Sequence, residues 1–141
     1  MFLCTIIIFS SCLKSDPESK IAGTWKLDDV VKRRAFNNKH LTTGYEAGLF
    51  TFYENGSATY RDSITLSGSW NMFYEDRGYY DVNGNYQYQN NLVLRIKLVN
   101  FAANRFIDWE FDETIFKRSN DRMDGFIYAA SAAYQYSFRR Q

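Results

Sequence analysis

Cysteine, proline and histidine are nearly missing from this 141-residue chain, and each scarcity excludes a class of structure or chemistry. The two cysteines, Cys4 and Cys12, both lie in the first dozen residues, so the rest of the chain can form neither a disulfide nor a cysteine-based metal site. The one histidine, His40, sits in a basic segment without a cysteine or a second histidine near it, and we expect it at the surface. This pattern predicts no metal site.

An excess of charge of either sign is missing as well. The chain has 17 basic and 16 acidic side chains, and its formal net charge of +1 gives no strong field to attract nucleic acid or an anionic membrane. Pro17 is the one proline and no long helical periodicity is present, whereas aromatic residues, which favour strands, make up 18% of the chain. The composition predicts an all-β chain with one domain that has a core of its own.

Sequence motifs of common catalytic sites are also absent. The chain contains no Gly-x-Ser-x-Gly, phosphate-binding loop or dinucleotide fingerprint. Asp108, Glu110 and Asp112 alternate along one strand face, which suits an acid/base pair or a cation site, but equally a solvated face opposite Trp109. We favour the solvated face. The sequence therefore predicts a protein that is not an enzyme and that carries no cofactor.

The first twelve residues, MFLCTIIIFSSC, form an apolar run that ends in small residues and a cysteine. The run is too short to span a bilayer as a helix, and it is typical of the apolar part of a secretory leader. Its end, Ser10-Ser11-Cys12, resembles a bacterial lipobox, in which the cysteine becomes the lipidated N-terminus. The alternatives are a plain secretory signal and a buried strand. We predict a signal peptide over residues 1–12 and lipidation of Cys12.

Residues 13–20, LKSDPESK, are polar and contain the proline. We interpret them as a flexible tether between the lipid anchor and a domain over residues 21–141. Lys14, Asp16 and Glu18 resemble the charged export signal that follows the cysteine in surface lipoproteins of Bacteroidota-type bacteria. The resemblance leaves open which side of the outer membrane the domain would face.

Residues 21–31, IAGTWKLDDVV, give the first strong strand signal of the predicted domain. With a period of two, Trp25, Leu27 and Val31 share one face, and Asp29 is the exception on that face. Gly23 has no Cβ, so another chain segment or a large ring can approach it closely. This stretch predicts a strand with one buried side and a tryptophan at one end of the core.

The Gly23-Thr24-Trp25 opening resembles the first strand of lipocalin-like proteins, which are small up-and-down β-barrels that hold a ligand in the barrel mouth. In that family a basic residue of the last strand commonly lies across the tryptophan. The resemblance therefore implies that Arg139 or Arg140 stacks on Trp25, and the sequence does not decide between the two arginines.

Seven further strands follow from alternation and turn signals. Asn55-Gly56, for example, is a tight-turn sequence between two of them. We predict these strands at 47–54, 57–62, 67–74, 92–99, 105–112 (continued or ended by 115–117), 121–129 and 134–139. The total of eight predicts a closed, antiparallel, up-and-down barrel, with room inside for side chains or one small ligand.

Two segments between the predicted strands lack clear alternation. Residues 32–46 are basic, and Lys32, Arg33, Arg34 and Lys39 there suit either an anionic group or a solvated loop. Residues 75–91 are rich in Tyr, Asn and Gln around Asn83-Gly84, which is typical of a protruding hairpin. Its tyrosines could stack on sugar rings, but we favour a simple polar hairpin tip. The tyrosines of this segment are Tyr79, Tyr80, Tyr86 and Tyr88.

These observations predict a lipoprotein of the bacterial cell envelope, held at the outer membrane by the lipid on Cys12, that binds a small, partly apolar ligand in its barrel. The residues expected to line or plug the barrel are Trp25, Tyr60, Trp70, Leu94 and Phe138. The alternative is a structural or interaction lipoprotein with a filled barrel, whose loops contact protein or glycan. An open apolar pocket would favour the first function, and a packed interior the second.

Overall fold

Ten strands and one short helix make up the computed structural model, which describes residues 16–117 and 119–141. The predicted leader with Cys12, and residues 13–15 of the predicted tether, lie outside the described residues. The elements are α1 (Pro17–Ile21), β1 (Gly23–Arg33), β2 (Asn38–Leu41), β3 (Leu49–Phe52), β4 (Ser57–Arg61), β5 (Thr65–Tyr80), β6 (Tyr86–Asn100), β7 (Arg105–Phe111), β8 (Glu113–Phe116), β9 (Arg122–Ala129) and β10 (Ala132–Arg140).

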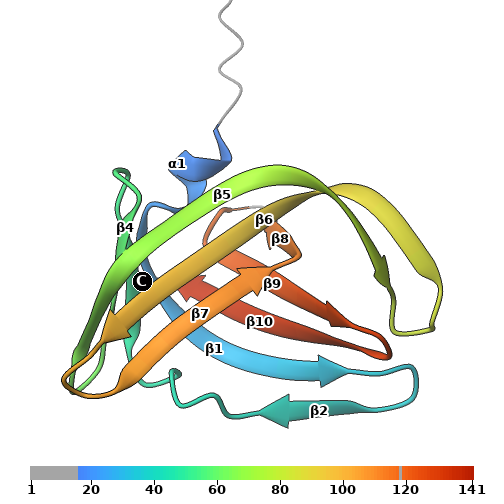
Figure 1. Cartoon of the computed structure of the whole chain (residues 1–141), viewed down its shortest axis with the longest axis horizontal. Helices are drawn as coiled ribbons and strands as arrows, with labels where there is room; N and C mark the ends of the chain where they lie inside the picture. Colours follow the sequence, from blue (N-terminus) through green and yellow to red (C-terminus); the bar gives the residue numbers. More distant parts are fainter. Residues whose placement is uncertain (1–15, 118) are drawn as a thin grey trace, which may run out of the picture.

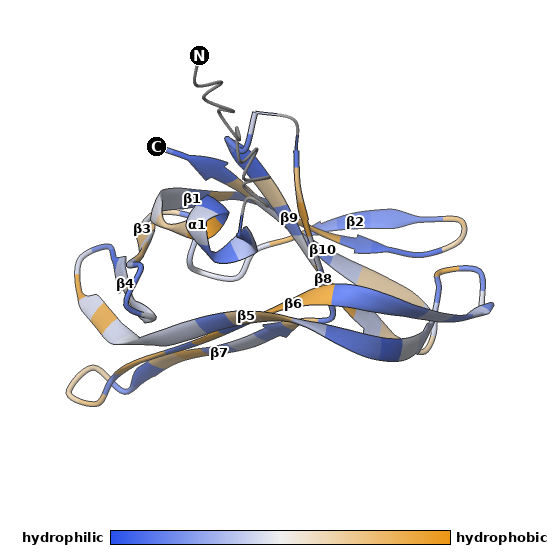
Figure 2. Cartoon of the chain, turned by 90° about the horizontal axis from the view of Figure 1, so that it is seen from above, coloured by the Kyte–Doolittle hydropathy of each residue, from blue (hydrophilic) through white to orange (hydrophobic). Residues whose placement is uncertain are grey.

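All strand pairs are antiparallel, and they form one sheet in the order β7-β6-β5-β4-β3-β1-β10-β9-β8, with β2 paired to β1 beside this path. The prediction of an all-β antiparallel chain is confirmed. In Figure 2, β5, β6 and β7 form one layer, and β1, β9 and β10 lie across from them. The sheet is not closed. However, its two end strands, β7 and β8, are separated in the chain by Asp112 alone, whose N–H donates to the carbonyl of Phe126 at 2.7 Å.

Two differences explain why ten strands are found where the sequence predicted eight. The first is β2, which forms a hairpin with β1 inside the basic segment 32–46 that we had expected to be a loop. The second is the stretch 105–117, which bends at Asp112, so that β7 pairs with β6 and β8 pairs with β9. Every other predicted strand is found, with shifted ends. The segment 75–91 is a hairpin, because β5 and β6 remain paired up to Tyr80 and Tyr86.

A β-bulge in β1 changes which residues of that strand face the core. The pairing of β1 with β10 shifts register between Leu27 and Asp29, so one extra residue enters β1 there. After the bulge the alternation moves by one position, and Val30 rather than the predicted Val31 belongs to the core cluster. The bulge also explains why Asp29 interrupted the predicted apolar face.

The predicted tether ends in a structured segment. Residues 17–21 form α1, which begins at Pro17 and is capped by the Asp16 side chain, and Ile21 at its end is fully buried. The helix lies beside the first residue of β1, and in Figure 1 it is on the upper side of the molecule while β2 is on the lower side. Within residues 16–117 and 119–141, no helix has the length and apolar character needed to cross a bilayer.

One apolar cluster fills the space between the layers. Its largest members are aromatic, and they come from β1, β3, β4, β5, β7 and β10. Leu94, Ile96 and Leu98 of β6 are also buried there, as their alternation predicted. The most deeply buried large side chains of the cluster are Trp25, Phe50, Phe52, Tyr60, Phe111 and Phe138.

Candidate functional site

The five residues predicted to line the barrel lie together in the packed cluster. None is more than 5% exposed. Phe50 contacts two of them, with ring centroids 4.8 Å from Tyr60 and 5.6 Å from Phe138, and Phe52 lies 5.9 Å from Trp70. The five are Trp25, Tyr60, Trp70, Leu94 and Phe138. Phe116 lies 6.3 Å from Trp25, so neighbouring aromatic rings pack against four of the five.

Trp25 closes the end of the cluster next to α1. Its indole N–H donates to the carbonyl of Ile21 at 2.7 Å, and the guanidinium of Arg140 lies 4.3 Å from the ring centroid. Arg140 also donates to the carbonyl of Ala22 at 2.7 Å. The sequence left open whether Arg139 or Arg140 stacks on Trp25. Arg140 is the one that does, whereas the Nε of Arg139 donates to Asp28 at 2.7 Å. Arg140 therefore holds both the tryptophan and the chain that leads out of α1.

Tyr45 covers the cluster at a second place, from the segment between β2 and β3. Its ring meets Tyr60 edge-on at 5.1 Å and Trp109 at 5.6 Å, and its hydroxyl donates to the carbonyl of Phe106 at 2.8 Å. The guanidinium of Arg105 lies 5.1 Å from the Tyr45 ring centroid. The segment 32–46 therefore contributes a plug to the core, which is a role apart from the anionic contact or solvated loop that its basic composition predicted.

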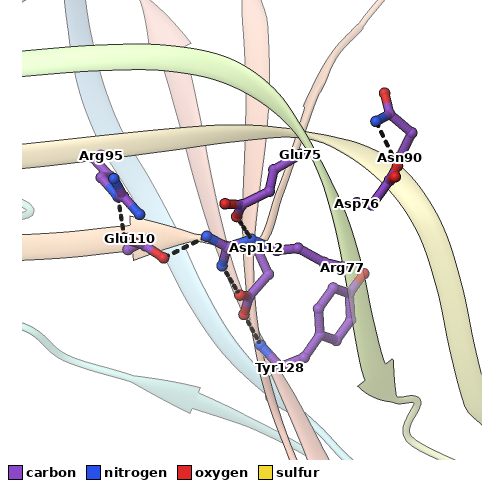
Figure 3. A network of polar contacts seen from close by, with 8 residues as sticks. All are labelled: Glu75, Asp76, Arg77, Asn90, Arg95, Glu110, Asp112 and Tyr128. Carbon is purple, nitrogen blue, oxygen red and sulfur yellow. Dashed lines mark hydrogen bonds and ion pairs between the residues drawn. The ribbon is translucent and has the colours of Figure 1, made fainter.

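Two of the three carboxylates predicted on one strand face, Glu110 and Asp112, belong to an ion-pair network around Arg77 of β5 (Figure 3). Arg77 donates to Glu75 at 2.6 Å, to Glu110 at 2.6 Å and to Asp112 at 2.5 Å, and its side chain is only 16% exposed. Arg95 forms a second ion pair with Glu110. The two arginines offset most of the charge of Glu75, Glu110 and Asp112, which places these carboxylates in a structural network rather than on the simply solvated face that we favoured.

Asp108 and His40, the other candidates for chemistry, lie in exposed pairs. Asp108 is 3.8 Å from Lys97, and the side chains of both are more than half exposed. The Nδ1 of His40 is 2.9 Å from Asp29, and the imidazole is 76% exposed. Across the described parts of the chain, no three His, Cys, Asp or Glu side chains are grouped so that they could hold a metal ion.

The β5–β6 hairpin has two different faces. On one face Arg77 holds β7, and Tyr79 stacks on Tyr128 of β9 with centroids 3.8 Å apart and planes 8° from parallel. On the other face four tyrosine rings are open to solvent, each between 52% and 68% exposed. We call this second face the tyrosine face; its rings are Tyr74, Tyr80, Tyr86 and Tyr88.

A hollow of about 360 Å³ lies on the β1–β2 hairpin next to β10. Lys32 is paired in register with Lys39 on β2 and with Tyr134 on β10, so these three side chains form a row across three strands. The Lys32 ammonium lies 5.1 Å from the centroid of the Tyr134 ring. We call this site the basic hollow; it is lined by Lys32, Arg34, Asn37, Lys39, Leu41 and Tyr134.

The sequence indicated some of these features and missed others. The basic residues of 32–46 and the tyrosines of 75–91 were visible as unusual composition, but their strand pairing was not. Arg77 and Tyr45 gave no signal, because Glu110 and Asp112, which accept from Arg77, and Phe106, which accepts from Tyr45, lie 33 to 61 residues away in the chain. Comparison of the chain with protein-family models, with curated proteins and with solved structures gave no match.

Proposed function

We propose that this chain is a lipoprotein of the bacterial cell envelope, anchored through Cys12, whose filled barrel presents a surface that contacts glycan. We also propose that the fold is an eight-strand, lipocalin-like barrel. Two features support that fold: β7 and β8 read as a single strand bent at Asp112, and Arg140 lies across Trp25 at the Gly-x-Trp opening. With β2 set aside as a side hairpin, this leaves eight strands in up-and-down order.

The packed interior favours an interaction role over transport of an apolar molecule. A ligand-carrying barrel needs a cavity lined by its inward side chains. Here those side chains pack on one another, and Tyr45 adds a ring from outside the sheet. An apolar ligand would have to displace several fully buried aromatic rings.

The tyrosine face carries the proposal of a glycan partner. Large exposed aromatic surfaces are uncommon on isolated proteins and indicate binding surfaces. Polar groups lie among the rings: Asp76 and Asn90 are paired in register on this face, and the amide of Asn90 donates to Asp76 at 2.7 Å. Aromatic rings that alternate with amide and carboxylate groups suit the C–H faces and hydroxyl groups of sugars. The Arg77 and Tyr79 contacts on the opposite face hold the hairpin in place, which lowers the entropic cost of binding.

The glycan contact can be tested with the variant Tyr80→Ala/Tyr88→Ala of the full chain. We expect this change to weaken binding to a panel of envelope polysaccharides by about tenfold or more, since each lost ring removes a stacking contact, and to leave thermal stability nearly unchanged. Affinity electrophoresis or a glycan array would measure it. Tyr53→Ala, an exposed tyrosine outside this face, is the matched control. Saturable binding of the neutral dye N-phenyl-1-naphthylamine at one site per chain, without any glycan binding, would instead favour an apolar-ligand carrier.

The anchor can be tested with Cys12→Ala. We expect the variant to remain unlipidated and to leave the membrane fraction, because Cys12 is the cysteine that follows Ser10-Ser11 at the end of the apolar run. Fractionation and metabolic labelling with a fatty acid would show this. Cys4→Ala is the control and should stay labelled. A labelled, membrane-bound Cys12→Ala protein would contradict the lipoprotein assignment.

A further inference from the structure

The basic hollow concentrates positive charge on one face of the β1–β2 hairpin. Lys32 and Lys39 stand directly opposite each other in the ladder, and Arg34, the residue after the end of β1, also lines the hollow. Directly opposed like charges in a sheet are destabilising. The hollow has no acidic lining residue, and within the described chain none of the three cations is ion-paired with a carboxylate. The arrangement therefore carries an electrostatic cost that a bound anion would remove.

On the opposite face of the same hairpin, the basic side chains do have polar partners within the protein. There His40 contacts Asp29 at 2.9 Å, and the Nε of Arg33 donates to Gln135 at 2.5 Å. The basic residues on that face thus have polar partners on neighbouring strands, whereas the hollow gathers three cations and no counter-charge. Because the whole chain has a net charge of only +1, this local excess is not a consequence of a generally basic surface.

We infer that the basic hollow binds a doubly charged oxyanion, either phosphate or the phosphate group of a phosphate monoester. Three cations exceed what one carboxylate would neutralise, and a dianion matches them more closely. Arginine donates two parallel hydrogen bonds to phosphate oxygens, and lysine acts as a point charge beside them. Asn37 adds an amide donor to the lining. The hollow, at about 360 Å³, also has room for an attached sugar-sized group.

The position of the hollow, taken with the proposed anchor on Cys12, favours a free molecule over a membrane headgroup. β1 has 11 residues, from Gly23 beside α1 to Arg33 at the hairpin, so the hollow is roughly 30 Å along the strand from α1. Figure 1 shows α1 on the upper side of the molecule and β2 on the lower side. The hollow therefore lies far from the end at which the chain enters the domain. The inference does not depend on the tyrosine face, which is a separate surface of β5 and β6.

Calorimetric titration of the full chain at low ionic strength tests this inference, with inorganic phosphate and glucose 1-phosphate as probes and glucose as the neutral comparison. The variant Lys32→Gln/Lys39→Gln should bind both phosphates at least about tenfold more weakly, because it loses two charge-assisted contacts. The control Lys26→Gln/Arg61→Gln has the same change in net charge away from the hollow, and should bind as the unaltered chain does.

Thermal unfolding provides a second measurement that does not require tight binding. Without phosphate, Lys39→Gln should unfold at a temperature equal to or above that of the unaltered chain, because it removes the Lys32–Lys39 repulsion. With phosphate, the unaltered chain should gain stability and the double variant should not. Equal stabilisation by sodium chloride at matched ionic strength, or equal loss of binding in the control, would overturn the inference. Binding only to vesicles that contain phosphatidic acid, lost in the double variant, would overturn the assignment to a free molecule.

Discussion

Replacing Trp25 with alanine is expected to lower the free energy of unfolding by about 3–5 kcal/mol, the usual cost of removing a large buried aromatic side chain. The indole is fully buried, and the substitution leaves a cavity beside Phe116, whose ring centroid is 6.3 Å away. It also leaves the carbonyl of Ile21 without its indole donor. Urea unfolding measures the effect. Trp25→Phe keeps most of the volume and should cost clearly less.

A double-mutant cycle separates the role of Arg140 from that of simple burial. Trp25→Ala and Arg140→Met should be non-additive, with a coupling of about 0.5–2 kcal/mol, because the guanidinium contacts the ring and both residues hold the chain around α1. Arg139→Met is the matched control, since Arg139 pairs with Asp28 and should add independently. Full additivity with Arg140, together with a mild Trp25→Ala, would contradict the position of this tryptophan at the closed end of the core.

Alternation in the sequence was sufficient to predict most of the sheet. A strand with one buried side has apolar residues at every second position, and this pattern can be recognised without knowing the neighbouring strands. Ala58 and Tyr60 of β4 are an example. The bulge in β1 could not be placed, because a single inserted residue depends on the partner strand. The bend at Asp112 likewise depends on two partners, β6 before it and β9 after it. The tight turn at Gly56, with φ of +82°, was predictable because its requirement is local.

The candidate sites were predictable only to the extent that they are local. The buried side chains were identified, but whether their interior is open or filled depends on Tyr45, which reaches the cluster from a segment with no strand signal. Predicting the basic hollow would have required knowing that Lys32 pairs with Lys39. Neither the β2 strand nor its register could be predicted from the sequence. The distance between two segments that are remote in the chain is set by tertiary packing, and the sequence pattern of either segment alone does not predict it.

Replacing Arg77 with methionine is expected to cost about 2–4 kcal/mol at neutral pH, near the range for breaking a buried ion pair and reduced by the partial exposure of its partners. Glu110 and Asp112 are 39% and 23% exposed, and both would lose a guanidinium contact. Arg95→Met, which removes an ion pair of a 40% exposed arginine, is the control and should cost about 1 kcal/mol or less. Loss of Arg77 should also increase amide hydrogen exchange in the outer part of the β5–β6 hairpin, since Arg77 links that hairpin to β7.

The cost of Arg77→Met should decrease as the pH falls, which distinguishes an ion pair from simple packing. Hydrogen bonds from Arg95 and then Arg77 lower the pKa of Glu110 below its ordinary value of 4.5. A lowered pKa contributes stability that is present above the ordinary value and is lost as the pH falls through the folded-state pKa. The unaltered protein should therefore lose this contribution below about pH 4.5, while the variant has less of it to lose. Urea unfolding at pH 7 and at about pH 3 should show a smaller difference between the two proteins at the lower pH. A difference that is the same at both pH values would mean that Arg77 stabilises the hairpin by packing of its alkyl chain and not by its charge.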